Sequence, residues 1–130
     1  MIVLDASAAI EWLLQSAPGL KIEDRIYSHG ETLHAPHLWD LEVAQVLRRL
    51  SLGGTISGSR ADEAFRDLRD LRINRYPHDV LLPRVWQMRH NFSAYDAAYI
   101  ALAEELKATL VTRDSKLASA SGHAARVELF

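Results

Sequence analysis

Short apolar segments alternate with longer segments of helical periodicity along the whole chain. The expected strands cover residues 1–5, 32–36, 73–76, 108–112 and 126–130. The expected helices cover residues 7–15, 20–29, 38–52, 59–72, 79–91 and 94–107, and a further short helix begins near Ser115. This alternation predicts an α/β fold with a mostly parallel central sheet and helices on both faces.

The bulk composition is that of one globular domain, which we expect to span residues 1–130. The chain is 48% hydrophobic and 25% charged and has no cysteine, which excludes disulfides, thiolate zinc sites and cysteine nucleophiles. No apolar run approaches the roughly 18 residues that a membrane span needs, and the first residues lack the features of a signal peptide. We therefore expect a cytoplasmic protein without a membrane partner.

The charge is distributed unevenly. The formal net charge is −2, so the total charge gives no sign of a nucleic-acid partner. Arginines are dense between Arg48 and Arg89, however, and could form a basic flank beside an acidic pocket. An equally good local interpretation is that they pair with acids of the same segment at helical spacing.

Two aspartates follow predicted strands. Asp5 ends "MIVLD", and Asp114 comes two residues after "ATLVT". Sites in parallel sheets form beyond the carboxyl ends of the strands, so both acids would lie at the same edge. Each could instead cap the helix that follows it, because aspartate is common at helix starts.

Glu42 lies deep inside a predicted helix, in "HLWDLEVAQVLRRL". Its helical neighbours include Leu38, Trp39 and Val46, so it borders the buried face and cannot be a cap. A buried carboxylate without a partner is costly and requires a partner or a cation. Arg49 is expected to lie too far round the helix to serve, which leaves an ion pair with a distant arginine as the alternative. Asp40, on the same helix, is expected to be more exposed.

Asp96 begins the alanine-rich segment "YDAAYIALAEEL". It could be the acidic partner of a capping box that starts at Ser93. It also precedes Ile100 by one turn and so borders an apolar stripe. Four acids from separate segments, all at the border of the core, are improbable as caps alone.

If Asp5, Glu42, Asp96 and Asp114 share one pocket, their charges need neutralisation. Two carboxylates ~4 Å apart repel by about 4 kcal/mol at an effective dielectric of 20. A hard divalent cation removes this repulsion, and oxygen ligands favour Mg²⁺, or Mn²⁺ as a substitute. The chemistry that fits is metal-assisted hydrolysis of a phosphodiester.

The segments "IVLDASA", "LWDLEVAQVL", "YDAAYIALAEEL" and "LVTRDSKL" resemble, in order and spacing, the motifs of PIN-domain ribonucleases, and most closely the VapC toxins of bacterial toxin–antitoxin pairs. The resemblance covers nearly the whole chain. It implies a three-layer α/β/α sandwich and a magnesium-dependent endoribonuclease acting on structured RNA such as tRNA or rRNA. It also implies a homodimer and a small antitoxin partner.

The resemblance assigns roles to six residues. The four acids would be the metal ligands and catalytic groups, with Asp5 and Asp96 the most central. Thr112 and Ser7 would hold carboxylates or a metal-bound water by hydrogen bonds. Some relatives carry a further acid soon after the fourth, whereas here Ser115 and Lys116 follow, so a second metal is less well supported.

Other functions fit less well. A P-loop, a G-x-S-x-G elbow and an H-E-x-x-H motif are all missing, and the six histidines are expected at surface or loop positions. A phosphoacceptor receiver domain would need adjacent acids after its first strand, and an aspartate-nucleophile phosphatase would need Asp-x-Asp where this chain has Asp5-Ala-Ser7. The remaining alternative is a catalytically inactive PIN-like domain that only binds a partner.

Trp12 and Trp39 allow two interpretations. Trp12 lies in a helix that is apolar nearly all round, which favours simple core packing. Alternatively, the two tryptophans contribute to a surface that binds the antitoxin or a second subunit.

Overall fold

The computed structural model describes all residues from 1 to 130 and contains one five-stranded sheet. The strands are β1 (Ile2–Leu4), β2 (Leu33–Pro36), β3 (Ile73–Tyr76), β4 (Thr109–Thr112) and β5 (Arg126–Leu129). Their order across the sheet is β3-β2-β1-β4-β5, and every neighbouring pair is parallel. The predicted parallel sheet is therefore confirmed, with all five expected strands in place.

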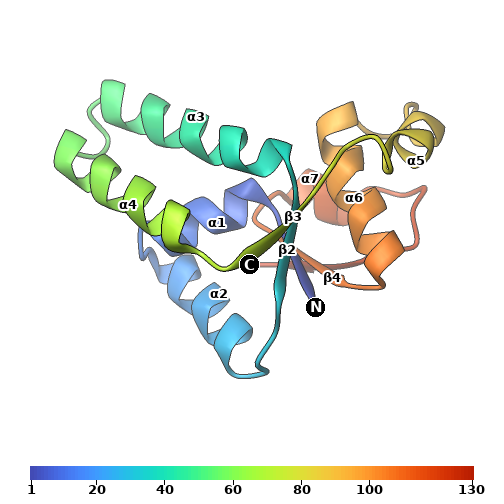
Figure 1. Cartoon of the computed structure of the whole chain (residues 1–130), viewed down its shortest axis with the longest axis horizontal. Helices are drawn as coiled ribbons and strands as arrows, with labels where there is room; N and C mark the ends of the chain where they lie inside the picture. Colours follow the sequence, from blue (N-terminus) through green and yellow to red (C-terminus); the bar gives the residue numbers. More distant parts are fainter.

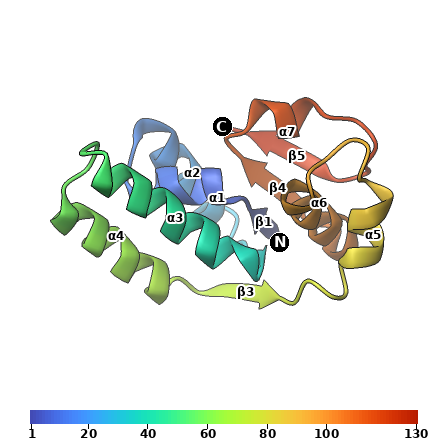
Figure 2. The ribbon, with the colours of Figure 1, turned by 90° about the horizontal axis from the view of Figure 1, so that it is seen from above.

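Seven helices surround the sheet. They are α1 (Ala6–Leu13), α2 (Ala17–Tyr27), α3 (Leu38–Leu52), α4 (Gly58–Asp70), α5 (Leu82–Gln87), α6 (Ala94–Leu106) and α7 (Ser115–Ser119). Helices α1 to α4 lie on one side of the sheet, and α5 and α6 lie on the other (Figures 1 and 2). This arrangement confirms the three-layer α/β/α architecture. None of the helices combines the length and the apolar character needed to cross a membrane.

Strand β1 lies at the centre of the sheet and all three of its residues are buried. A strand covered by helices on both faces carries apolar side chains on both faces, which explains the unbroken run "IVL". Its residues belong to one cluster of 32 buried apolar residues that extends from α1 to α7. The core therefore holds the end of β1 firmly in place.

Helix α2 begins three residues earlier than the predicted helix at 20–29. Ser16 caps it, because its hydroxyl accepts a hydrogen bond from the Gly19 amide at 3.1 Å. Pro18 lies in the first turn, where a missing N–H costs nothing. A Cβ atom on Gly19 would lie 1.9 Å from the Glu11 carbonyl oxygen, so α2 packs against α1 at a distance that only glycine allows.

Helix α5 is shorter than the predicted helix at 79–91. The amides of Leu81 and Leu82 both donate to the His78 carbonyl, so residues 78–81 form a turn before the helix begins. Beyond Gln87, the chain makes irregular turns up to Ser93. Apolar periodicity in this segment therefore reflects packing against the core and not a continuous helix.

The register of the sheet brings two distant segments together. Leu4 of β1 pairs with Val111 of β4, and the Asp5 amide donates to the Val111 carbonyl at 3.0 Å. Asp5 and the segment after Thr112 therefore leave the sheet side by side at the carboxyl edge. The first turn of α6 lies at the same edge, because α6 runs back toward the start of β4.

Candidate active site at the carboxyl edge of the sheet

A cavity of about 530 Å³ opens at the carboxyl edge of the sheet. All four predicted acids line it, namely Asp5, Glu42, Asp96 and Asp114, and so does Ser7. Thr112 is fully buried directly behind it and contacts Asp5. The structure thus brings the six predicted site residues together from β4, α3, α6 and the segments after β1 and β4.

Asp5 is fixed by two hydroxyl groups. Its Oδ2 atom accepts hydrogen bonds from Ser7 Oγ and from Thr112 Oγ1, each at 2.6 Å. The side chain makes no capping hydrogen bond to α1, although Asp5 occupies the N-cap position. The capping interpretation of Asp5 is therefore wrong, and its carboxylate is oriented by groups that lie up to 107 residues away in the sequence.

Thr112 and Asp114 are linked through the backbone. The Asp114 amide donates to Thr112 Oγ1 at 3.0 Å, so one hydroxyl contacts Asp5 and positions the segment that carries Asp114. Asp114 also caps α7, because its Oδ1 atom accepts from the amides of Lys116 and Leu117 at 2.9 and 3.3 Å. The capping prediction holds for Asp114, and the same side chain lines the cavity.

Glu42 has a partner that the sequence did not reveal. Its Oε1 atom accepts a hydrogen bond at 2.8 Å from the hydroxyl of Tyr99, whose side chain is buried. No ion pair involves Glu42, so the alternative of a distant arginine is excluded. Tyr99 lies three residues after Asp96, one turn along the same face of α6, and this spacing was the available signal.

Asp96 stands in the first turn of α6. Ser93 caps this helix and accepts a hydrogen bond from the Asp96 amide at 3.1 Å. The carboxylate is half-buried and lines the cavity. The Ser93 cap therefore exists as expected, and it holds Asp96 at the carboxyl edge of the sheet.

The cavity is electrostatically unfavourable for its own carboxylates. Burial raises the pKa of Asp5, and the nearby charge of Asp114 adds to it, against the hydrogen bonds from Ser7 and Thr112. Burial also raises the pKa of Glu42 and of Asp96, and neighbouring carboxylates contribute in both cases. None of the four acids forms an ion pair within the chain. Such a site favours protons or an added cation.

The rest of the cavity wall includes Arg49, Leu41 and Tyr95. Arg49 lies two turns beyond Glu42 on α3, which is too far for an ion pair but on the same face of the helix. Arg49 therefore does not neutralise Glu42, as expected, although the reason is its distance along the helix and not its angle around it. Leu41 and Tyr95 are 77% and 68% exposed, and neither was recognised as part of the site. Asp40 points elsewhere and forms a bidentate pair with Arg75.

The acids share a cavity without forming a closed cage. No three histidine, aspartate or glutamate side chains in the chain are grouped as a ready-made set of metal ligands. The four carboxylates therefore line one cavity, but they do not form a complete ligand set on their own.

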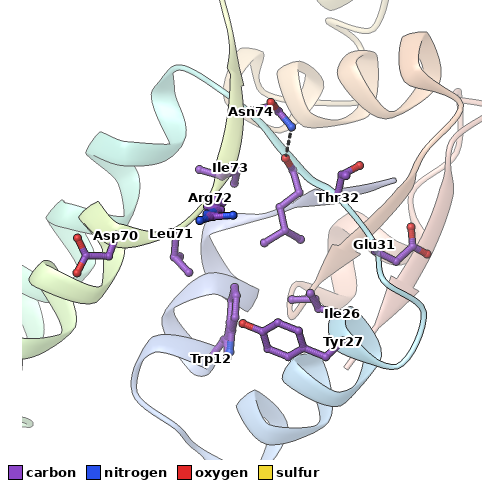
Figure 3. Close-up of a pocket in the computed structure, with 11 residues that line it drawn as sticks. Trp12, Ile26, Tyr27, Glu31, Thr32, Asp70, Leu71, Arg72, Ile73 and Asn74 are labelled. Carbon is purple, nitrogen blue, oxygen red and sulfur yellow. Dashed lines mark hydrogen bonds between the residues drawn. The ribbon is translucent and has the colours of Figure 1, made fainter.

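A larger cavity of about 640 Å³ lies near the amino ends of β2 and β3 (Figure 3). The rings of Trp12 and Tyr27 meet edge to face in it, with their centroids 6.2 Å apart. Trp12 is only 6% exposed and Trp39 is fully buried elsewhere, so the interpretation as core packing is confirmed for both tryptophans. Glu31 lines this cavity but pairs with Arg25 and with the terminal amine. The cavity therefore lacks a cluster of unpaired acids.

Comparison with known proteins agrees with this geometry. The family model of the PIN domain matches residues 2–122. The chain belongs to the PIN-domain family. Within it, the chain is similar to the VapC ribonucleases: it is 44% identical to Ribonuclease VapC9 of Mycobacterium tuberculosis over 117 residues, which are 90% of this chain and 88% of the relative. It is 38% identical to Ribonuclease VapC12 of the same species over 129 residues, 99% of this chain and 98% of the relative.

Solved structures share the fold. The crystal structure of M. tuberculosis VapC20, described as a toxin that cleaves the sarcin–ricin loop, superposes with a TM-score of 0.68 at 14% identity and covers 95% of this chain and 97% of its own. The structure of VapBC2 from Rickettsia felis, bound to a DNA fragment from its promoter, gives a TM-score of 0.63 at 14% identity and covers 99% of this chain and 98% of its own. At these identities, the similarity establishes the fold.

Proposed function

We propose that this protein is a Mg²⁺-dependent endoribonuclease and acts as the toxin of a bacterial toxin–antitoxin pair. The observation that carries the proposal is the convergence of Asp5, Glu42, Asp96 and Asp114 on one cavity without any basic partner. Its relatives at 38–44% identity are named ribonucleases. A purely structural cluster of this kind would be selected against, because unpaired carboxylates in a shared cavity reduce stability.

The donor set fits a hard divalent cation. The four acidic side chains offer only carboxylate oxygens as ligand atoms, and the chain has no cysteine that could supply a sulfur ligand. Asp5, Asp96 and Asp114 would hold Mg²⁺, or Mn²⁺ in its place, and Glu42 would complete the set directly or through water. When bound, the cation would stabilise the charge that develops on the scissile phosphate and lower the pKa of a coordinated water.

The surrounding residues keep these oxygens in position. Ser7 and Thr112 both donate to Oδ2 of Asp5, which leaves Oδ1 free of a hydroxyl donor. Tyr99 donates to Oε1 of Glu42 and leaves its second oxygen free to accept a proton from an attacking water. Hydrogen bonds of this kind fix the rotamer of a ligand before the substrate arrives, which lowers the cost of reorganisation during the reaction.

The substrate we propose is structured RNA, of the tRNA or rRNA class. Arg49 is exposed on the wall of the acid cavity and forms no ion pair, so its guanidinium is available for a phosphate next to the cleaved one. Cleavage of the sarcin–ricin loop, the activity by which VapC20 is described, is an example of such a substrate for a protein of this fold. A positive side chain beside the acids is consistent with a polyanionic ligand.

We further propose a cognate antitoxin and a homodimer. The antitoxin is supported by the similarity to VapBC2 of R. felis, which was solved as a complex. The cavity beside the exposed Tyr27, which apolar and charged residues line together, is a suitable contact surface for an amphipathic partner segment (Figure 3). The alternative function is a catalytically inactive PIN-like domain that binds a partner through the same surfaces.

The deciding experiment is cleavage of total RNA by purified, antitoxin-free protein with Mg²⁺ or Mn²⁺. We expect discrete fragments that disappear with EDTA and with the Asp5→Asn variant. The exposed Asp24→Asn substitution on α2 is the matched control and should leave cleavage unchanged. Fragments that persist in EDTA would contradict the metal site. Folded protein that cleaves no RNA with either metal would favour the inactive alternative.

A further inference from the structure

Tyr95 occupies a position between two cavities. It lines the acid cavity and also a second, smaller cavity of about 150 Å³, and Leu38 lines both as well. Its side chain is 68% exposed and its hydroxyl makes no hydrogen bond within the chain. A large aromatic ring is thus presented to solvent directly beside the four carboxylates, although it contributes little to the core.

The second cavity is small and almost entirely apolar. Seven of its eight lining residues are hydrophobic, and they come from α3, α5, α6 and the turn before α5. Its volume suits one aromatic ring, since an apolar protein cavity of about 150 Å³ accepts a benzene molecule. Pockets that bind drug-sized ligands are about 300–1,000 Å³, so a larger group would not fit.

His78 is the one polar residue of this cavity. Its Nε2 atom accepts a hydrogen bond from the Leu38 amide at 2.9 Å, so the neutral ring carries its proton on Nδ1. Nδ1 makes no hydrogen bond within the chain. The lining therefore combines apolar faces with one histidine whose Nδ1 proton is not used within the chain, a composition that suits a flat ring with acceptors at its edge.

We propose that Tyr95 and the cavity beside it bind one nucleobase of the RNA, adjacent to the phosphate that lies over the acids. This inference rests on the proposed ribonuclease function. A base has apolar faces that stack on tyrosine and an edge with hydrogen-bond acceptors, and RNA recognition in single-stranded regions uses such stacking. Because the two cavities share Tyr95 and Leu38, one nucleotide step connects a base in the small cavity to a phosphate in the acid cavity.

The test measures binding separately from cleavage. Fluorescein-labelled single-stranded RNA octamers are titrated into the Asp96→Asn protein, which should bind RNA without cutting it, and anisotropy gives Kd. Adding Tyr95→Ala should weaken binding by roughly 5- to 150-fold, the range of one base stacked on an aromatic ring. Tyr95→Phe should bind within about twofold of the parent, because it keeps the ring on which the base stacks.

Trp86→Ala is the matched control. Trp86 is also 68% exposed and lies on α5, but it lines neither cavity. Its removal should leave Kd unchanged. An octamer with one abasic position, scanned along the strand, gives a second test. At one position, removal of the base should weaken binding to the Asp96→Asn protein as much as Tyr95→Ala weakens binding of the intact octamer. The Tyr95→Ala protein should then bind that abasic octamer no more weakly than it binds the intact one.

The outcomes distinguish failure of the nucleobase site from failure of the proposed ribonuclease function. Normal cleavage by the wild-type protein, together with equal Kd values for Tyr95→Ala and Trp86→Ala, would overturn the nucleobase site alone. Loss of the dimer in Tyr95→Ala, measured by light scattering, would also overturn it and would assign Tyr95 to the contact with a second copy of the chain. Absence of cleavage by the wild-type protein would instead contradict the proposed function.

Discussion

The carboxylates at the two edges of the sheet have opposite electrostatic surroundings. At the carboxyl edge, Asp5, Glu42 and Asp96 have no basic partner, and burial raises the pKa of each. Near the amino edge, Glu104 accepts two hydrogen bonds from Arg84, at 2.7 and 3.0 Å, and Glu31 pairs with Arg25 and the terminal amine. These contacts lower the pKa of both glutamates.

This difference distinguishes acids that stabilise the fold from acids that are available for chemistry. The chain has arginines enough to neutralise the carboxyl edge, but it uses Arg25, Arg75 and Arg84 to pair other acids. Carboxylates that are both buried and unpaired, at a cost in stability, distinguish the candidate site better than pocket size does. The larger cavity near the amino edge has no cluster of buried, unpaired acids, because its Glu31 is paired and its Asp70 is exposed.

The largest effect is expected at Asp5. Replacing it by asparagine keeps the shape and the contacts to Ser7 and Thr112 but removes the central charge. We expect the cleavage rate to fall by roughly 10³-fold or more, about 4 kcal/mol of transition-state stabilisation. The melting temperature should not decrease. Single-turnover cleavage and circular dichroism measure the two effects, and an active Asp5→Asn enzyme would contradict the comparison between the edges.

A smaller loss is expected at Thr112, which touches no substrate. Thr112→Val keeps the volume but removes the donor to Asp5 and the acceptor for the Asp114 amide. Loss of a group that orients a metal ligand costs roughly 10- to 100-fold in activity or metal affinity. Thr112→Ser should recover most of this loss. A Mg²⁺ titration of cleavage by the two variants distinguishes positioning from general destabilisation, which would leave the metal requirement unchanged.

At the amino edge, removal of a charge should affect stability and not activity. Glu104→Gln weakens the bidentate contact with Arg84, and we expect a loss of about 1 kcal/mol in the free energy of unfolding at pH 7. Cleavage should remain within a factor of about two, because the site is at the opposite edge. The neighbouring, exposed Glu105→Gln is the control and should change neither quantity.

The stability difference between wild-type protein and Glu104→Gln should depend on pH. The folded protein holds the pKa of Glu104 below its ordinary value, so the ion pair contributes stability above that value. The contribution is lost as the pH falls through the lowered pKa. The difference between wild-type protein and Glu104→Gln should therefore be complete at pH 7, begin to decline near the ordinary glutamate pKa of about 4.3, and disappear only below the lowered pKa. A difference that is independent of pH would show that packing, and not charge, is responsible.

The last effect is as small as that of Glu104→Gln and has the opposite sign. In EDTA, Asp96→Asn should raise stability by about 1 kcal/mol, or roughly 3–5 °C in Tm, because burial and the charges of Asp5 and Asp114 disfavour the ionised form of Asp96. Mg²⁺ should stabilise the wild-type protein more than the variant. Asp67→Asn, on the exposed face of α4, is the control. A lower Tm for Asp96→Asn in EDTA would contradict the unpaired state of this edge.

Much of the fold and of the acid set could be predicted because each rests on local patterns. An unbroken apolar run indicated β1, the alternation with helical segments indicated the other four strands, and the position of Asp5 and Asp114 after parallel strands predicted their common edge. Contacts between distant segments could not be predicted. The contact of Tyr99 with Glu42 and the position of Tyr95 between two cavities depend on how α3 and α6, from opposite sides of the sheet, meet at its carboxyl edge. Helix α5 was overestimated because periodicity alone does not detect the turn at His78.

The contact between Asp5 and Thr112 joins residues 107 positions apart and has a consequence for synthesis. Asp5 leaves the ribosome among the first residues, but the strand that orients it emerges near the end of translation. At about 5–20 residues per second, the delay is roughly 5–20 s. During that time, Asp5 lacks the hydroxyl of Thr112, and the segment that carries Asp114 has not been made. A site built in this order is incomplete until the chain is nearly finished, so the cleavage that we propose for it could not begin earlier in synthesis.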